Sequence, residues 1–243
     1  MKSKIGIVCA GDQEVAPFLR LIDECSVSEK AMLKFYHGKI EDVEIVTLFC
    51  GVCKTNAAIA TQILIDTYGC NAIFNAGTAG GMDEKIQLFD TVVSTESAYW
   101  DVSAGILTEF HPFMKTIFFS ANQELISIAK VAISRNRLSN VYFGTMITGE
   151  TFIEDEHRNE INMKLPALCV DMETASIAHT CYVNEIPFIA VRTITDTAEH
   201  GGVEAFEQNC DRASQISANV VIAILKEIAH GCGRSVFHGG DLF

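Results

Sequence analysis

Short runs of apolar residues recur along the chain, and amphipathic segments separate several of them. Four of these runs lie at residues 4–10, 72–76, 166–170 and 187–191. They show little alternation of apolar and polar side chains, which is typical of strands buried on both faces of a parallel sheet. Apolar side chains spaced three or four residues apart, as on one face of a helix, follow the runs. This order of strands and helices predicts an α/β domain.

The stretch 166–196 is predicted to form a strand, a helix and a second strand, and polar side chains follow both strands. Glu173 follows the first strand, and Arg192 and Asp196 follow the second. In such a unit the strands are parallel, so their carboxyl ends lie at the sheet edge where α/β folds bind ligands. Burying two acids and an arginine there costs desolvation free energy that a purely structural role rarely justifies. The pattern therefore indicates an active site.

The first strand, over residues 4–10, leads into a predicted amphipathic helix whose apolar face extends to Cys25. Pro17 fits only the first turn of such a helix, because proline donates no backbone hydrogen bond. Glu14 would lie near the carboxyl end of the first strand, at the same edge as the later acids if the strands are parallel. An acid at this position also complements the helix dipole, so Glu14 alone has two interpretations.

The remaining pattern predicts further helices and strands without a linker between domains. The expected elements are a hairpin over 35–49 turning at 41–42, helices over 56–68, 122–135, 155–163 and 203–229, and strands over 72–76, 90–99 and 141–148. The charged helix over 155–163 is expected to be exposed, and the glycine-rich stretch 77–81 to form a loop close to a ligand. Residues 100–119 fit neither the helical spacing nor the strand pattern of apolar residues.

We therefore predict one α/β domain over residues 1–230. Its central β-sheet is mixed, mostly parallel and flanked by helices, and a flexible glycine-rich tail follows over 231–243. A chain of 243 residues can bury a sizeable core in one such domain.

Composition excludes several classes of partner. The net charge is −13, from 18 Lys and Arg against 31 Asp and Glu, which disfavours nucleic acid, anionic membranes and unescorted phosphate. No apolar run approaches the roughly 20 residues that span a bilayer. Nine cysteines without a secretion signal indicate free thiols in a reducing cytoplasm. Cys50 and Cys53 have the spacing of a redox pair, but they close a strand, and we do not favour that role.

Five motifs, taken together and in order, resemble the nucleoside phosphorylase superfamily and, within it, the 5′-methylthioadenosine/S-adenosylhomocysteine nucleosidases. The resemblance covers residues 4 to about 229. The motifs are KIGIVCAxxxEV at 4–15, NAGTAGG at 75–81, TGETFI at 148–153, VDMETA at 170–175 and VRTITD at 191–196.

The resemblance implies a role for each of eight residues. Glu14 matches the acid that activates water, and Asp196 the acid that serves the purine. The groups expected to bind substrate are Met172 and Glu173 at the ribose, Phe152 and Ile153 at the base, and Thr78 and Arg192 near the water and ribose. The resemblance also implies a homodimer and a small-molecule adenine nucleoside substrate. Neither a metal nor an organic cofactor is required.

These residue types suit the chemistry of N-glycosidic cleavage. The bond breaks through an oxocarbenium-like ribose, and adenine leaves readily only after N7 is protonated. Burial favours the protonated form of an acid such as Asp196, while Glu14 on the opposite face of the sugar would take a proton from water. The negative charge of Glu173 favours the cationic transition state over the neutral substrate.

Two other functions stay open. A purine nucleoside phosphorylase would hold a phosphate dianion, but the loop after the first strand offers Asp12 and Glu14 and no basic residue before Arg20. Such acids repel phosphate, so hydrolysis is favoured. A non-catalytic nucleoside-binding protein would have no need of a water-activating acid.

The sequence departs from the family pattern at three places. Asp171 stands where glutamate is usual, and Thr195 replaces the more common serine. Residues 100–119 lack the usual Phe-Gly-Tyr-rich pattern of a region that, in the family, helps to bind the 5′ group, partly across a dimer interface.

Overall fold

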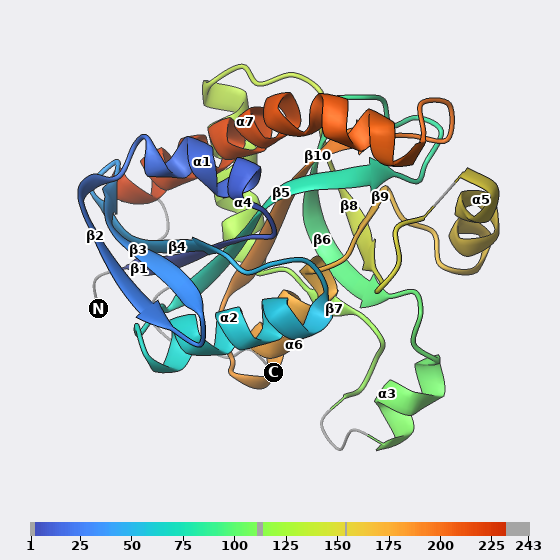
Figure 1. Ribbon diagram of the computed structural model, residues 1–243, viewed down its shortest axis with the longest axis horizontal. Helices are drawn as coiled ribbons and strands as arrows, with labels where there is room; N and C mark the ends of the chain where they lie inside the picture. The colour runs from blue at the N-terminus through green and yellow to red at the C-terminus, as the bar shows by residue number, and fades with distance from the viewer. Residues whose placement is uncertain (1–2, 111–113, 154, 232–243) are drawn as a thin grey trace.

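The computed structural model describes residues 3–110, 114–153 and 155–231, and a ten-stranded sheet occupies their centre (Figure 1). Beyond Gly231, the predicted tail over 231–243 lies outside the described residues. Among the described residues, no helix is both long and apolar enough to cross a membrane.

Strand β5 (Ala72–Gly81) organises the sheet, because three other strands pair with it. Strands β1 (Lys4–Cys9) and β10 (Phe188–Asp196) lie parallel to β5. The last two residues of β5, Gly80 and Gly81, pair antiparallel with the short strand β9 (Cys169–Asp171).

The pairings around β5 close into a ring. Strand β10 pairs with β6 (Thr91–Tyr99), β6 pairs with β8 (Val141–Thr148), and β8 pairs with β9, which returns to β5. The other strands extend this ring. They are β4 (Val43–Phe49), β3 (Leu33–Ile40) and β2 (Asp23–Lys30), which follow β1 in that order, and β7 (Phe119–Ser120), which pairs with β6.

Helices flank the sheet (Figure 1). On one side lie α1 (Asp12–Leu19), α4 (Gln123–Arg135) and α7 (Gly202–Ala229), and on the other α2 (Lys54–Asp66) and α6 (Thr174–Val183). Two further helices lie at the periphery, α3 (Ala104–Phe110) and α5 (Asp155–Lys164).

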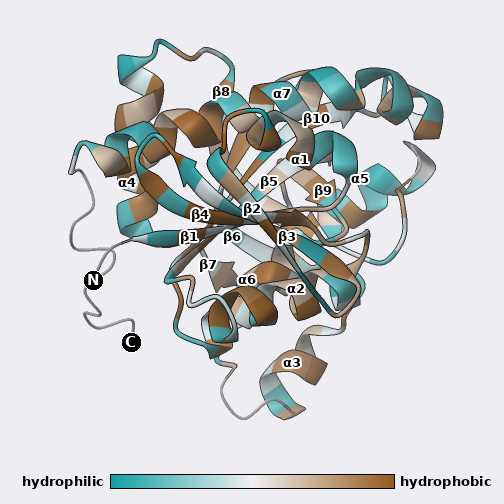
Figure 2. Cartoon of the chain, turned by 60° about the vertical axis from the view of Figure 1, so that its left-hand side comes forward, coloured by the Kyte–Doolittle hydropathy of each residue, from teal (hydrophilic) through white to brown (hydrophobic). Residues whose placement is uncertain are grey.

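The central strands are mostly apolar (Figure 2), and a hydrophobic core lies on each face of the sheet. In β1, Ile5 and Ile7 pack in the core formed with α1, α4 and α7, while Val8 packs in the core formed with α2 and α6. All three side chains are fully buried. Because successive side chains of a strand point to opposite faces, a strand with apolar residues on both faces serves both cores.

The predicted fold, a single α/β domain with a mixed sheet flanked by helices, is confirmed. The predicted hairpin is also present, with β3 and β4 antiparallel around Glu41 and Asp42. Antiparallel pairings are as frequent as parallel ones, five of each, so the sheet is less parallel than predicted.

The predicted first helix is too long. Helix α1 ends at Leu19, and Cys25 lies exposed in the edge strand β2. Pro17 was predicted to lie in the first turn of this helix, but it is the sixth residue of α1. A proline at that position removes one helical hydrogen bond. The helix ends two residues later, so this loss falls in its final turn.

The predicted loop over 77–81 is wrong, because β5 continues through it to Gly81. Its glycines still allow a close approach. A Cβ atom on Gly77 (φ +154°) would lie 2.2 Å from Glu14 Oε1, well inside the contact distance. The group that approaches the backbone here is the side chain of Glu14.

The predicted parallel orientation of the strands before and after α6 is also wrong. Strand β9 runs antiparallel to β5, whereas β10 runs parallel to it. The prediction assumed that α6 connects two strands of one parallel sheet. In the structure β9 and β10 each pair separately with β5, and β9 does so in the antiparallel direction. Val170 in β9 and Asp196 in β10 are both opposite Gly80, so polar residues at the ends of both strands converge there.

Candidate active site

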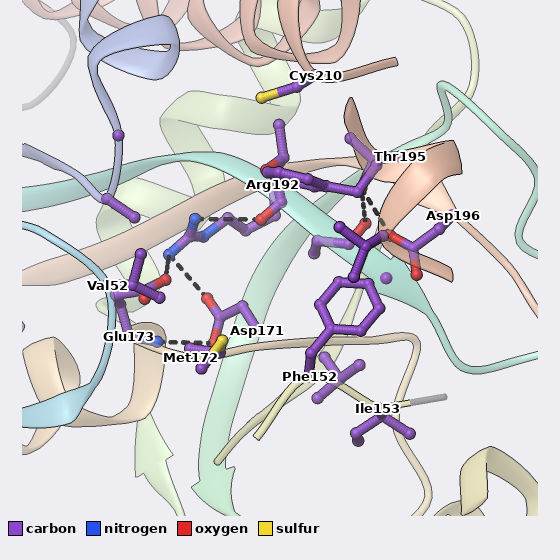
Figure 3. A pocket seen from close by; sticks show the side chains of 18 of the residues that line it. Val52, Phe152, Ile153, Asp171, Met172, Glu173, Arg192, Thr195, Asp196 and Cys210 are labelled. Carbon is purple, nitrogen blue, oxygen red and sulfur yellow. Dashed lines mark hydrogen bonds and ion pairs between the residues drawn. The ribbon is translucent and has the colours of Figure 1, made fainter. Parts of the chain in front are cut away.

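A pocket of about 290 Å³ lies at the carboxyl ends of β1, β5, β9 and β10 (Figure 3). All eight residues expected to act on or bind a substrate line this pocket. They are Glu14, Thr78, Phe152, Ile153, Met172, Glu173, Arg192 and Asp196. The ring topology thus brings together residues that are up to 182 positions apart, from Glu14 to Asp196.

Glu14 is held as a hydrogen-bond acceptor by the turn between β1 and α1 and by β5. Its Oε2 accepts from the backbone N–H groups of Ala10 (2.6 Å) and Gly11 (3.2 Å). Its Oε1 accepts from the backbone N–H of Thr78 (2.7 Å) and from the Thr78 hydroxyl (2.9 Å). Only 4% of Glu14 is exposed. Four donors fix the carboxylate, so both of its oxygens have a defined position in the pocket.

Arg192 connects the carboxylates at this end of the pocket (Figure 3). Its Nη2 lies 2.8 Å from Asp171 Oδ2 and 3.1 Å from Glu173 Oε2, and its Nη1 lies 3.5 Å from Glu14 Oε1. Burial alone would lower the pKa of Arg192, but the charges of Asp171, Glu14 and Glu173 outweigh it and raise that pKa. Arg192 therefore remains a cation that offsets part of the charge of the three acids.

Glu173 binds a proton more tightly than an ordinary glutamate. Burial, together with the charges of Asp171 and Glu14, raises the pKa of Glu173 to about 7 against the opposing effect of Arg192. Its Oε1 also accepts from the backbone N–H of Cys53 (2.9 Å) at the start of α2. Glu173 can thus exchange a proton near neutral pH.

Asp171 is a buried residue whose importance the sequence did not indicate. Its Oδ1 accepts from the Thr148 hydroxyl (2.6 Å) and from the backbone N–H of Thr174 (3.1 Å), while its Oδ2 contacts Arg192. The Thr174 hydroxyl also donates to Asp171. These bonds fix the turn between β9 and α6, which carries Met172 and Glu173.

The other end of the pocket holds Asp196, at the end of β10. Its Oδ1 accepts from the Thr195 hydroxyl (2.7 Å), and its Oδ2 accepts from Nη2 of Arg158. Arg158 belongs to α5, the helix expected to be exposed, yet only 2% of Arg158 is accessible. Sequence analysis missed this residue.

Apolar side chains separate the two charged ends. Figure 3 shows Phe152 between Asp196 on one side and Met172 and Glu173 on the other. The ring of Phe206, from α7, lies 6.5 Å from that of Phe152 in an edge-on arrangement. Such a slot, with polar groups at both ends, suits a flat heterocycle attached to a polyhydroxylated ring.

A metal centre is not apparent in the part of the chain that the structure describes. No group of three or more His, Cys, Asp or Glu side chains there is arranged to hold a metal ion. The acids of the pocket are instead engaged by arginines, hydroxyls and backbone N–H groups.

Comparisons with known proteins agree with this fold. Residues 4–226 match the family model of the phosphorylase superfamily. The chain is 32% identical to the 5′-methylthioadenosine/S-adenosylhomocysteine nucleosidase of Staphylococcus carnosus, over 92% of this chain and all of that one. It is 35% identical to the nucleosidase of the same name from Halalkalibacterium halodurans, over 92% of this chain and 98% of that one.

Solved structures of similar proteins have the same fold. A 5′-methylthioadenosine/S-adenosylhomocysteine nucleosidase from S. pneumoniae with a transition-state inhibitor superposes with a TM-score of 0.85 at 27% identity, covering 93% of this chain and 99% of that one. The corresponding nucleosidase from Neisseria meningitidis, in complex with methylthio-immucillin-A, gives 0.85 at 27% identity, covering 92% and 99%.

Proposed function

The chain belongs to the phosphorylase superfamily and, within it, to the 5′-methylthioadenosine/S-adenosylhomocysteine nucleosidases, and we propose that it hydrolyses the N-glycosidic bond of 5′-substituted adenine nucleosides. Methylthioadenosine or S-adenosylhomocysteine would yield adenine and the free ribose derivative. The observation that carries the proposal is the division of one pocket into two ends. Glu14 and Glu173 share Arg192 at one end, and Asp196 lies at the other, beyond Phe152.

At the first end we assign Glu14 as the base and Glu173 as the ribose ligand. Glu14 is buried and fixed by four donors, so it can accept a proton from a water molecule held at one position. Thr78 and Arg192 orient it. Ionised Glu173 would accept both ribose hydroxyls, and its charge would stabilise the oxocarbenium-like transition state. Met172 would contact the ribose beside it.

At the second end we assign Asp196 as the acid that protonates N7 of the base. Phe152 would stack on the purine, and backbone groups of Ile153 would contact its edge. Protonation makes adenine a neutral leaving group, and such a transfer is worth about a hundred- to ten-thousand-fold in rate. The proton that Glu14 gains from water returns to Asp196 through solvent after each turnover.

Water is favoured over phosphate as the nucleophile because the pocket's cations are already engaged. Arg192 donates to carboxylates and to the Thr78 carbonyl, and Arg158 donates to Asp196 and to the Gly81 carbonyl. Among the described lining residues these are the only arginines or lysines. A phosphate dianion beside Glu14 would therefore meet like charge. A purine nucleoside phosphorylase would instead need a free cation there.

The test is release of adenine from methylthioadenosine in phosphate-free buffer. We expect adenine and methylthioribose to form at equal rates, with no change when phosphate is added. If adenine appeared only with phosphate, together with a ribose 1-phosphate, the chain would be a phosphorylase. Tight binding without any turnover would identify a non-catalytic nucleoside-binding protein.

We also propose that the chain forms a homodimer. Helix α3 stands away from the body of the molecule (Figure 1), and none of its residues is buried. It exposes Ile106 (55%) and Phe110 (79%), and Ile59 on α2 is 45% exposed. Contiguous exposed apolar patches mark protein contacts, and we propose that these side chains contribute to one. Light scattering after size-exclusion chromatography should give twice the chain mass, and I106E/F110E should give a monomer.

The cysteines support a reducing compartment, and we propose the cytoplasm. The eight cysteines of the described part of the chain are all free, and burial raises the pKa of several of their thiols, such as Cys70 to about 12. Cell fractionation tests this location. Recovery of the protein outside the cytoplasmic fraction would overturn it.

A further inference from the structure

Arg158 connects three parts of the base end of the pocket. Its Nη1 donates to the carbonyl oxygen of Gly81 (2.7 Å), at the end of β5. Its Nη2 donates to the carbonyl oxygen of Ile153 (3.3 Å) and to Oδ2 of Asp196. The Arg158 side chain thus contacts both Asp196, the acid proposed to protonate the purine, and the backbone of Ile153, which is proposed to contact the edge of the purine.

Contacts of α5 with the rest of the protein hold Arg158 in place. Ile161 and Leu165, three and seven residues after Arg158, pack against the hydrophobic cluster that includes Ile147 and Ile153. Asn162, four residues after Arg158, donates to the Met82 carbonyl and accepts from the Ala167 N–H (3.1 and 2.7 Å). The contacts of α5 and of Leu165, which follows it, therefore set where the guanidinium lies.

We propose that Arg158 is a positioning residue for the base end, which aims the Asp196 carboxyl group at the purine and stabilises the carboxylate that remains when the proton leaves it. This inference rests on the proposed function. The proton passes from Asp196 to N7, the electron pair of the C1′–N9 bond moves to the base, and water adds to C1′ while Glu14 takes its proton. The carboxylate of Asp196 then pairs with the guanidinium of Arg158.

The position of Arg158 favours this role over one in ribose binding or water activation. The groups around Asp196 are the Thr195 hydroxyl from β10, the backbone of β5 at Gly80 and the Arg158 guanidinium from α5. The other charged side chains of the pocket are Glu14, Asp171, Glu173 and Arg192, which interact with one another at the ribose end. Arg158 thus supplies the positive charge that touches Asp196.

The kinetic test compares two leaving groups in R158Q and R158K. Hydrolysis of methylthioadenosine needs protonation of the base, whereas a nitrophenyl riboside has a leaving group that does not. We expect R158Q to lower kcat for methylthioadenosine about ten- to a hundredfold, the loss expected for a charge-assisted hydrogen bond. The nitrophenyl riboside should change by less than about threefold. R158K keeps the charge and should recover part of the loss.

The matched control is K164Q, on the same helix. Lys164 is 73% exposed and pairs with Glu160, so this variant removes a cation from α5 without touching Asp196. Both substrates should be hydrolysed as in the wild type. Equal losses for both substrates in R158Q would mean that Arg158 has only a structural role and would overturn the proposal.

A second measurement does not depend on turnover. The infrared band of the protonated Asp196 carboxyl group can be identified by its loss in D196N and followed against pH. In R158Q the band should persist to higher pH than in the wild type, because the guanidinium that stabilises the carboxylate is gone. An unchanged transition in a folded R158Q protein would overturn the proposal. An inactive wild type with a shifted transition would overturn the proposed hydrolysis alone.

Discussion

Glu14 and Asp196 are both buried carboxyl groups, yet their partners suit them to opposite tasks. Glu14 accepts from three backbone N–H groups and the Thr78 hydroxyl, which hold both of its carboxyl oxygens as hydrogen-bond acceptors. Asp196 lies beyond Phe152 and contacts a hydroxyl and a guanidinium. Amide replacements at the two positions should therefore respond differently to the leaving group.

We predict that Glu14→Gln lowers kcat about a hundred- to ten-thousand-fold for both methylthioadenosine and a nitrophenyl riboside, because the base is absent whichever group leaves. Asp196→Asn should lose a similar factor with methylthioadenosine and recover part of it with the nitrophenyl riboside. Steady-state kinetics with both substrates make the comparison. Rescue of both variants by the good leaving group would show that the two roles are assigned wrongly.

The raised pKa of Glu173 predicts a pH dependence of stability. Because the folded pKa is about 7 and the ordinary value is 4.5, the folded state binds the proton more tightly than the unfolded state. Stability should therefore fall as pH rises from about 4.5 to about 7 and change little above that range. In Glu173→Gln this component should be absent, so the Tm of the variant relative to the wild type should rise over the same range. Parallel curves of Tm against pH would contradict the assignment.

At the scale of elements, β5 can approach Glu14 of α1 closely because Gly77 has no side chain. A Cβ on Gly77 would overlap the carboxyl group of Glu14, which cannot move without losing its bonds to Ala10 and Thr78. We predict that Gly77→Ala lowers kcat at least about tenfold and stability by about 1–3 kcal/mol. Gly69→Ala is the control. Gly69 has φ +67° with open space around it, so this change should cost about 1–2 kcal/mol of stability and leave kcat unaltered.

The elements predicted best from sequence are those with local signals. The β3–β4 hairpin has an acidic turn followed by a mostly apolar strand, and α4 begins after Asn122, which accepts from the N–H groups of Glu124 and Leu125. Strand β2 was missed because its side chains are almost all exposed, so no buried face marks it. Tertiary pairing with β3 determines its conformation.

The sequence also contained an unused signal in α5 and the residue after it. Arg158, Ile161, Asn162 and Leu165 have the spacing of one helix face, but the surrounding charges suggested an exposed helix. The orientation of β9 could not be read in this way, because three residues carry no direction signal. The strand-end pattern indicated Glu14, Glu173, Arg192 and Asp196, the resemblance added the other four site residues, and the pocket unites all eight. The roles of these residues stay predictions, which the variants proposed above test.

At the scale of the whole molecule, Arg192 joins parts of the chain that are remote in sequence. It links Glu14 of α1 to Asp171 and Glu173 at the β9–α6 turn, from its own place in β10. Removing the cation would leave three buried acids without their shared partner. Arg192→Met should lower the free energy of unfolding by about 3–5 kcal/mol at neutral pH. Denaturant titrations should show a smaller deficit at acid pH, where the carboxyl groups are neutralised. A deficit independent of pH would indicate lost packing instead.

The position of β10 also bears on how the protein acquires its structure. This strand lies between β5 and β6, yet it begins 107 residues after β5 ends and 89 residues after β6 ends. A growing chain that has not reached Phe188 leaves the ring open, with strand edges on both sides of the gap. Closing it joins distant segments, and such non-local pairing slows folding to about milliseconds or seconds. The pocket therefore comes into being late, when the last strand enters the middle of the sheet.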